Sequence, residues 1–271
     1  MKRSTLWVTT CLVVVLAMLL AALFSRSLSQ RRAVAALLAV DKTSVSSAME
    51  GPSDLLGYPH WNLLQGYTDA IDNISLRSDE TADLFVENLS VFDDISILTM
   101  WANVSDQSVQ RVAEALVARG QTIDGLLCRS SVSSQRVLDA VLSAPSNALM
   151  LVDVGFAGPD LSRLQGCTGL QYLTIDGRGG GSNKSGLSDT SNFDEEALSA
   201  ILHCPSLNYL SLYHLSVSDE LASGLAQSNT IMQIRLQECS ISRESLQALK
   251  KAIPRTTSFV LVNGVEIEVD E

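Results

Sequence analysis

The chain has 271 residues, of which 46% are hydrophobic and 18% are charged, and its formal net charge is −11. This composition excludes a disordered polymer, a collagen and a small disulfide scaffold. Residues 1–40 contain five basic residues and no acidic residue, and subtracting these five positive charges from −11 leaves −16 for the remainder. Because such a charge repels phosphate backbones, we expect no nucleic acid as a partner, and basic partners or divalent cations fit better.

The N-terminal segment contains a long apolar run. Leu6 to Phe24 are 19 residues without a charge, and a helix of about 20 apolar residues spans a bilayer. A cleaved signal peptide is the alternative, but its apolar region is usually shorter and ends at small residues. The sequence therefore predicts a tail over residues 1–5, followed by a transmembrane helix over residues 6–24 that acts as an uncleaved signal anchor.

The charges that flank this run bear on its orientation in the membrane. Two basic residues precede it and three follow it, so the positive-inside rule gives no clear direction. A short N-terminal tail before a globular domain most often stays in the cytoplasm. We therefore expect a single-pass protein of the cytoplasmic membrane whose C-terminal domain is extracytoplasmic.

Residues 25–70 are expected to connect this anchor to the rest of the chain. The segment RRAVAALLAV, residues 31–40, continues as a predicted helix, and the turn-forming residues Gly51, Pro52, Gly57 and Pro59 follow it. The sequence thus predicts a juxtamembrane helix and then a linker.

From about residue 71 the chain repeats the pattern L-x-x-L-x-L. The clearest copies are LQYLTI from Leu170, LNYLSL from Leu207 and IMQIRL from Ile231. Weaker copies begin at Ile71, Ile95, Ile123 and Leu149. Helix-spaced apolar residues follow each copy, so every unit predicts one strand and one helix. Stacked units give an α/β solenoid over residues 71–271, with a curved parallel sheet, helices on the convex side and a closing strand over residues 257–267.

These units resemble the leucine-rich-repeat family, specifically its strand-plus-helix members similar to ribonuclease inhibitor and the cysteine-containing class. Cys167 and Cys204 each stand three residues before the first leucine of a strand, and Cys239 stands three residues after the last. The resemblance implies a leucine-rich-repeat solenoid that binds other proteins. It also implies that these thiols are small core residues and do not form disulfides.

The sequence offers little support for catalysis. The three histidines, His60, His203 and His214, lack the spacing of a zinc site, and the chain has neither a Cys-x-x-Cys motif nor a nucleophile elbow. His203 and Cys204 are adjacent, but neighbouring helical residues point in different directions. We therefore predict that the protein is not an enzyme and has no catalytic residue, metal or cofactor.

Two other functions stay open. The stretch GRGGGSNKSG suggests a phosphate-binding loop, although Asn183 and not glycine precedes Lys184. An enzyme or nucleotide-binding protein that uses residues 177–192 with His203 or His214 is therefore the first alternative. A structural component of the cell envelope is the second.

The concave face of the predicted sheet is the candidate binding surface. Tyrosine and arginine supply much of the energy at protein interfaces, and neighbouring strands lie about 5 Å apart. The candidate partner-binding residues are Tyr172, Thr174, Asp176, Tyr209, Ser211, Tyr213 and Arg235. A cross-strand aromatic ladder that only stabilises the sheet explains the tyrosines equally well. Our leading hypothesis is a membrane-tethered, non-catalytic module that binds a protein partner on this face.

Overall fold

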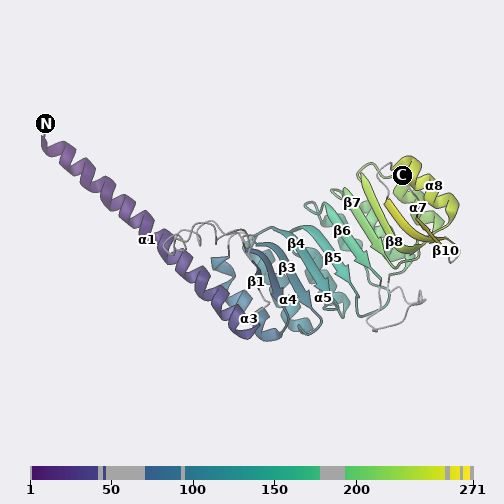
Figure 1. Cartoon of the computed structure of the whole chain (residues 1–271), viewed down its shortest axis with the longest axis horizontal. Coiled ribbons are helices and arrows are strands. Elements are labelled where there is room, and N and C mark those ends of the chain that lie inside the picture. The colour runs from purple at the N-terminus through teal and green to yellow at the C-terminus, as the bar shows by residue number, and fades with distance from the viewer. Residues whose placement is uncertain are drawn as a thin grey trace.

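The computed structural model describes residues 2–41, 45–46, 71–92, 95–177, 193–253, 257–262 and 265–268. One ten-stranded sheet runs through these residues, and its strands lie side by side in the order of the chain (Figure 1). The strands are β1 (Val45–Ser46), β2 (Ile71–Leu76), β3 (Ile95–Trp101), β4 (Ile123–Arg129), β5 (Ser146–Val152), β6 (Tyr172–Asp176), β7 (Tyr209–Tyr213), β8 (Gln233–Ser240), β9 (Thr257–Val262) and β10 (Val265–Glu268).

Neighbouring strands from β2 to β9 pair in parallel. At the two ends of the sheet, β1 pairs antiparallel with β2, and β10 pairs antiparallel with β9. The protein is therefore an α/β protein with a parallel sheet, as the sequence predicts. The single closing strand expected over residues 257–267 is instead the β9–β10 pair.

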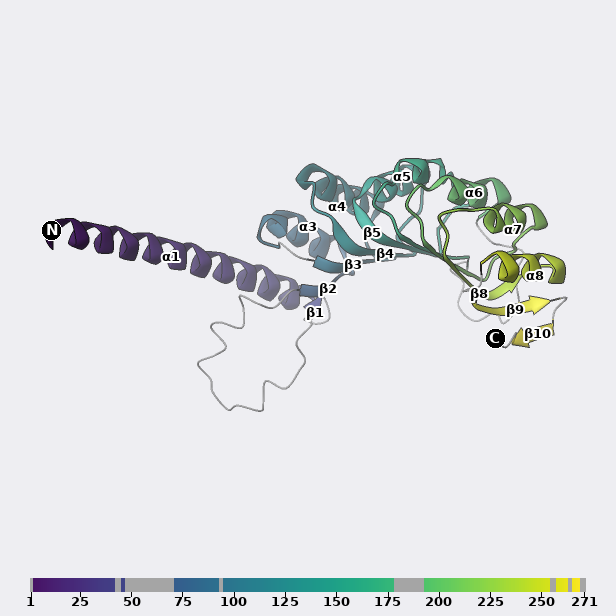
Figure 2. The same ribbon diagram turned by 90° about the horizontal axis from the view of Figure 1, so that it is seen from above.

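The helices between the strands lie on one side of this sheet. They are α3 (Asp79–Asn88), η2 (Leu89–Val91), α4 (Asp106–Arg119), α5 (Gln135–Ser143), η3 (Ser162–Gly166), α6 (Glu195–Ser199), η4 (Ala200–His203), α7 (Asp219–Ala226) and α8 (Arg243–Ala252). Figure 2 shows that the sheet bends, with the helices along its outer side. Among the described residues, the opposite side of the strands carries no helix.

The core lies between the sheet and the helices. Alternate strand residues point to the same side, and the parallel register aligns them into two buried rows. The rows are Ile74, Leu98, Leu126, Leu149, Leu173, Leu210 and Ile234, and Leu76, Met100, Cys128, Leu151, Ile175, Leu212 and Leu236. Helix residues such as Val112, Leu138 and Leu249 complete the core from the other side.

The register corrects one predicted repeat boundary. Leu149 pairs with Leu173 and with Leu126, which hold the fourth position of their units, so this unit begins at Ser146 and not at Leu149. The sequence frame failed there because Ser146 replaces the first leucine. Although Ser146 is polar, it is buried at the position of that leucine and is only 8% exposed.

The N-terminal prediction is wrong. The run from Leu6 to Phe24 does not form a helix of its own, because it belongs to α1 (Lys2–Val40), which carries Arg26, Arg31 and Arg32 in its second half. Across the described residues, neither α1 nor any other helix combines the length and the apolarity that crossing a membrane requires. The predicted transmembrane helix, signal anchor and cytoplasmic-membrane location are therefore not supported.

The C-terminal half of α1 belongs to the domain. Ala33 and Leu37 are buried in the same core as the repeat leucines, and α1 lies beside α3 at the end of the sheet (Figure 1). The expected juxtamembrane helix is thus part of α1 and covers the first repeat. Residues 42–44 and 47–70 of the predicted linker lie outside the described residues, as do residues 178–192 of the glycine-rich loop.

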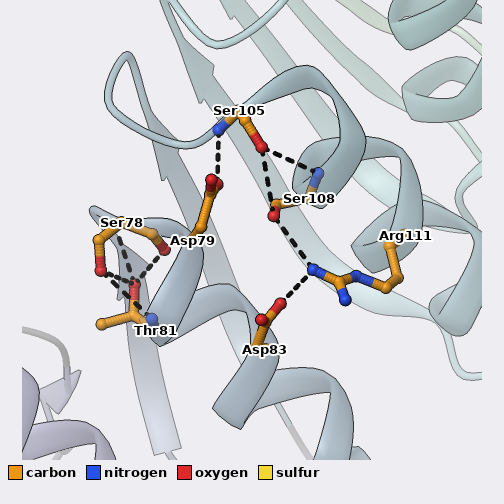
Figure 3. Close-up of polar contacts among 7 residues, drawn as sticks. All are labelled: Ser78, Asp79, Thr81, Asp83, Ser105, Ser108 and Arg111. Atoms are coloured by element: carbon orange, nitrogen blue, oxygen red, sulfur yellow. Dashed lines mark hydrogen bonds and ion pairs between the residues drawn. The ribbon is translucent and has the colours of Figure 1, made fainter.

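Contacts between acidic residues and serines link several pairs of neighbouring helices. Ser105 caps the N-terminus of α4, and its backbone N–H donates to Asp79 at the start of α3 over 2.7 Å (Figure 3). Ser242, the N-cap of α8, donates through its hydroxyl to Asp219 at the start of α7 over 2.6 Å. We call these contacts the acid–serine ladder.

The acid–serine ladder has an electrostatic consequence. The backbone hydrogen bond from Ser105 lowers the pKa of Asp79, and the hydroxyl of Ser242 lowers the pKa of Asp219. Arg111 of α4 also pairs with Asp83 of α3 (Figure 3). The helical side of the domain therefore holds much of its acidic charge in contacts between neighbouring repeats.

The four cysteines that the structure describes fully are free thiols. Cys128, Cys204 and Cys239 are buried and Cys167 is half-buried. Burial raises the pKa of Cys128 to about 12 and that of Cys239 to about 11. The three buried cysteines therefore serve as apolar core residues that stay protonated near neutral pH.

Candidate binding surface on the sheet

The sheet face is the side of the strands opposite the helices. Its residues alternate with the two buried rows and align across the strands in three further rows. In strand order these rows include Asn73, Ile97, Gly125, Ala148, Tyr172, Tyr209 and Gln233; Ser75, Thr99, Leu127, Met150, Thr174, Ser211 and Arg235; and Trp101, Arg129, Val152, Asp176, Tyr213 and Gln237.

All seven candidate residues belong to these rows, on three adjacent strands. In the register of β6, β7 and β8, Tyr172 pairs with Tyr209, Thr174 with Ser211 and Asp176 with Tyr213, and Ser211 in turn pairs with Arg235. The fold thus brings the candidates together, although their role in binding is not tested by their position.

The two tyrosines stack on each other. Their ring centroids are 4.4 Å apart and the ring planes differ by 7°. Tyr172 is still 44% exposed, because no described helix covers this side of the sheet. Part of the predicted aromatic ladder therefore exists, and it leaves one ring accessible to a partner.

Arg235 lies beside this pair, on the next strand. Its guanidinium carbon is 5.7 Å from the centroid of the Tyr213 ring, and Nη2 donates to Oε1 of Gln237 over 3.2 Å. A cation over an aromatic face contributes about 0.5–1 kcal/mol at exposed sites. The contact holds an exposed planar donor group next to the tyrosines.

Asp176 has a different environment from the other candidates. It is only 8% exposed, and its Oδ1 lies 2.8 Å from Nδ1 of His214. The other ring nitrogen of His214 lies 2.9 Å from Oε2 of Glu238. Because carboxylates only accept hydrogen bonds, both contacts are hydrogen bonds when both ring nitrogens carry protons. Asp176 therefore positions His214 and does not itself lie open to a partner.

The backbone places His214 and Glu238 at the same point of their repeats. His214 follows β7 with φ 56°, and Glu238 lies near the end of β8 with φ 53°. Ser130 and Asp153 adopt the same left-handed conformation after β4 and β5, which is uncommon for residues other than glycine. Sequence reasoning missed the His214–Glu238 contact, although aligning the repeats places the two residues on neighbouring strands.

A second cluster, also missed, lies on β2, β3 and β4. Arg77 directly follows β2, Trp101 ends β3 and Arg129 ends β4, and the register pairs Trp101 with Arg129. The guanidinium carbons of Arg77 and Arg129 lie 4.8 Å and 4.9 Å from the Trp101 ring centroid. We call this the Arg–Trp–Arg triplet. The sequence search considered only the last strands of the sheet and so did not reach it.

Apolar side chains fill the space between the two clusters. Ile97 is 42% exposed, and Leu127, Met150 and Val152 are half-buried. The sheet face therefore has aromatic and arginine side chains at both ends and an apolar centre, a composition typical of the fully buried part of protein interfaces.

The candidates for metal binding and thiol chemistry in the described part of the chain are histidine, cysteine and carboxylate residues. No group of histidine, cysteine and carboxylate residues there could hold a metal. A cleft of about 550 Å³ between β5 and η3 is lined by Cys167 and Arg163, but burial and the neighbouring Cys204 raise the pKa of Cys167 to about 11. His203 is exposed whereas Cys204 is buried, so the two do not form a pair.

Comparison of the chain with protein-family models and with curated proteins gives no match in either case.

Proposed function

We propose that the chain is a protein-interaction module of the leucine-rich-repeat kind that binds a protein partner on its sheet face and has no catalytic activity. The stacked pair of Tyr172 and Tyr209, with Arg235 on the adjacent strand, is the observation that carries this proposal. The repeat pattern and the resemblance to leucine-rich-repeat proteins support it further.

The exposure of Tyr172 has an energetic cost that a partner would remove. A ring that only stabilised the sheet would gain most from being covered, yet Tyr172 is 44% exposed. Aromatic and arginine side chains dominate the binding energy of protein interfaces, because a partner removes a large apolar area and their polar ends still find hydrogen bonds. A partner that covered Tyr172 and Arg235 would gain both the buried apolar area and the hydrogen bonds.

Site-specific crosslinking tests this proposal. A photo-crosslinking amino acid at Ser211, between the tyrosine pair and Arg235, should give a discrete covalent adduct with another protein in the cells that the chain comes from. The same amino acid at Gln247, which is exposed on α8, is the control on the helical side and should give none.

Substitution of the tyrosines completes the test. The double variant Tyr172→Ala, Tyr209→Ala should reduce the Ser211 adduct by about thirtyfold, the effect expected for two residues that each contribute about 1 kcal/mol to binding. Circular dichroism checks that the variant is folded. An unchanged adduct in a folded variant, or equal adducts from Ser211 and Gln247, would refute binding on the sheet face.

The two alternative functions predict different experimental results. A nucleotide site at residues 177–192 lies almost wholly outside the described residues, and it predicts nucleotide binding that is lost in Lys184→Ala. A purely structural component predicts that substitutions on the sheet face change no interaction. The crosslinking experiment therefore also separates the proposal from the structural alternative.

A further inference from the structure

The charge on the sheet face has the opposite sign to the charge of the protein. The charged side chains in the three rows that define this face on β3–β8 are Arg129, Asp176 and Arg235, and Arg77 extends the same edge after β2. Asp176 is buried against His214. The net charge of −11 belongs to the whole chain, and the exposed charge on these rows is that of arginine.

The Arg–Trp–Arg triplet presents hydrogen-bond donors and no acceptor. Arginine and the indole N–H only donate, and Nε1 of Trp101 is buried without an acceptor among the residues that the structure describes. The two guanidinium groups that share the Trp101 ring repel each other, and a bound anion would relieve this repulsion. The repulsion between the two arginines therefore favours a ligand that brings acceptors and negative charge.

The carboxylates near the Arg–Trp–Arg triplet do not neutralise both of its arginines. Asp41 contacts Nε of Arg77 at 3.6 Å, and within the described part of the chain the two terminal nitrogens of that guanidinium make no ion pair. Asp153, directly after β5, accepts a hydrogen bond from Ser130 over 2.5 Å. Arg129 is exposed, and within the described part of the chain its side chain contacts the Trp101 ring.

We infer that the sheet face recognises an acidic, extended segment of the protein partner, with its carboxylates on the Arg–Trp–Arg triplet. This inference rests on the proposed function and specifies the chemistry of its partner. It reverses the expectation from net charge, which favoured a basic partner. A nucleic acid fits less well, because the domain around the triplet is strongly acidic and would repel a phosphate backbone.

The length of the site sets the length of the segment. Trp101 on β3 and Tyr213 on β7 lie in the same row and are separated by four strand spacings, which is about 19 Å. An extended chain spans that distance with about six residues. The segment would therefore carry carboxylates at one end and apolar or aromatic residues toward the other, over the apolar centre of the sheet face.

Blocked decapeptides that alternate tyrosine with glutamate, lysine or glutamine test this inference on the full chain. Fluorescence anisotropy with labelled peptides should show the glutamate peptide binding at least about tenfold more tightly than the lysine peptide, because like charges brought together weaken binding strongly. A ten-nucleotide oligothymidylate serves as the competing anion and should bind more weakly than the glutamate peptide.

Three variants locate the binding. Arg129→Gln should weaken the glutamate peptide about fivefold, the loss of one charge-assisted hydrogen-bonding group. The affinity of Arg129→Lys should lie between that of the wild-type chain and that of Arg129→Gln, because lysine keeps the charge and loses the planar guanidinium group. Arg136→Gln is the matched control, since Arg136 is an exposed arginine on α5 of the helical side, and it should change nothing.

Three results would overturn the inference. They are equal binding of the three peptides, tighter binding of oligothymidylate, and unchanged affinity in a folded Arg129→Gln variant. The proposed function is tested separately by the crosslinking experiment. A Ser211 adduct with a partner that lacks an acidic contact segment would support binding on the sheet face and refute only the preference for acidic segments.

Discussion

The two faces of the repeat domain use different chemistry. On the helical side, acidic residues in the first turns, such as Asp79 and Asp219, are bound to serines and thus to neighbouring repeats. In the three rows of the sheet face on β3–β8, the exposed charges are Arg129 and Arg235, and both lie over aromatic rings. The acidic residues connect the repeats, and the arginines point to the side where a partner can reach them.

This difference shows that the net charge of the chain does not give the sign of the charge on one face. The sum over the chain is dominated by carboxylates, many of which stabilise helix N-termini, where the helix dipole favours negative charge. The sign at the sheet face depends on a few arginines that contribute little to the total. Three predictions test the comparison, from the largest expected effect to the smallest.

The first prediction concerns adjacent residues of β4 that point to opposite sides. Leu126 is 1% exposed in the core, whereas Leu127 lies half-buried on the sheet face. Leu126→Ala should lower the free energy of unfolding by about 3 kcal/mol, through lost apolar burial and a cavity, and Leu127→Ala by less than about 1 kcal/mol. Urea denaturation followed by circular dichroism measures both. Equal losses would mean that the sheet face is packed like the core.

The second prediction concerns the acid–serine ladder and pH. The hydrogen bond from Ser105 lowers the pKa of Asp79 below its ordinary value of 3.8, so the folded state gains stability above that pH and loses it as the pH falls through the lowered pKa. Asp79→Asn should therefore flatten the decline of the free energy of unfolding below about pH 4. Denaturant titrations from about pH 7 to about pH 3 measure this slope.

The matched control for Asp79 lies on the same helical turn. Glu80→Gln removes one negative charge from the start of α3 without removing the bond to Ser105. We expect its stability to follow pH as the wild-type chain does. If the two variants gave the same slope, the charge at the helix end and not the contact between repeats would explain the pH dependence.

The third prediction concerns the thiols and involves no change in stability. Burial raises the pKa of Cys128 to about 12, and Cys167 is half-buried beside the cleft at η3. In a Cys11→Ala background, a thiol reagent at about pH 8 should label Cys167 first and Cys128 only after unfolding. Mass spectrometry of the labelled peptides identifies the order. Labelling of Cys128 at the same rate as Cys167 in the folded chain would contradict its place in the core.

Much of the repeat architecture could be predicted from the sequence because it depends on local periodicity. Apolar residues at fixed spacing, such as Leu170, Leu173 and Ile175, specify a strand with one buried side whatever the rest of the chain does. The predicted start of one repeat was wrong where Ser146 takes the place of a leucine. The stacking of Tyr172 on Tyr209 followed from the same frame.

The remaining features depend on contacts that no single segment encodes. The run from Leu6 to Phe24 is apolar by itself, but it continues into a helix whose end packs on α3. The Asp176–His214–Glu238 contacts join three repeats, and the Arg–Trp–Arg triplet joins three others. Side-chain partners of this kind become visible only once the register of neighbouring strands is known.

The acid–serine ladder also bears on how such a domain can change its length. Each of its contacts joins one repeat to the next and reaches no further, so stability is shared between nearest neighbours as in other stacked repeats. A duplicated unit that kept its first-turn acid and its capping serine would bring both halves of the junction with it. The chain could thus gain a strand, and with it a wider sheet face, without a redesign of the units on either side.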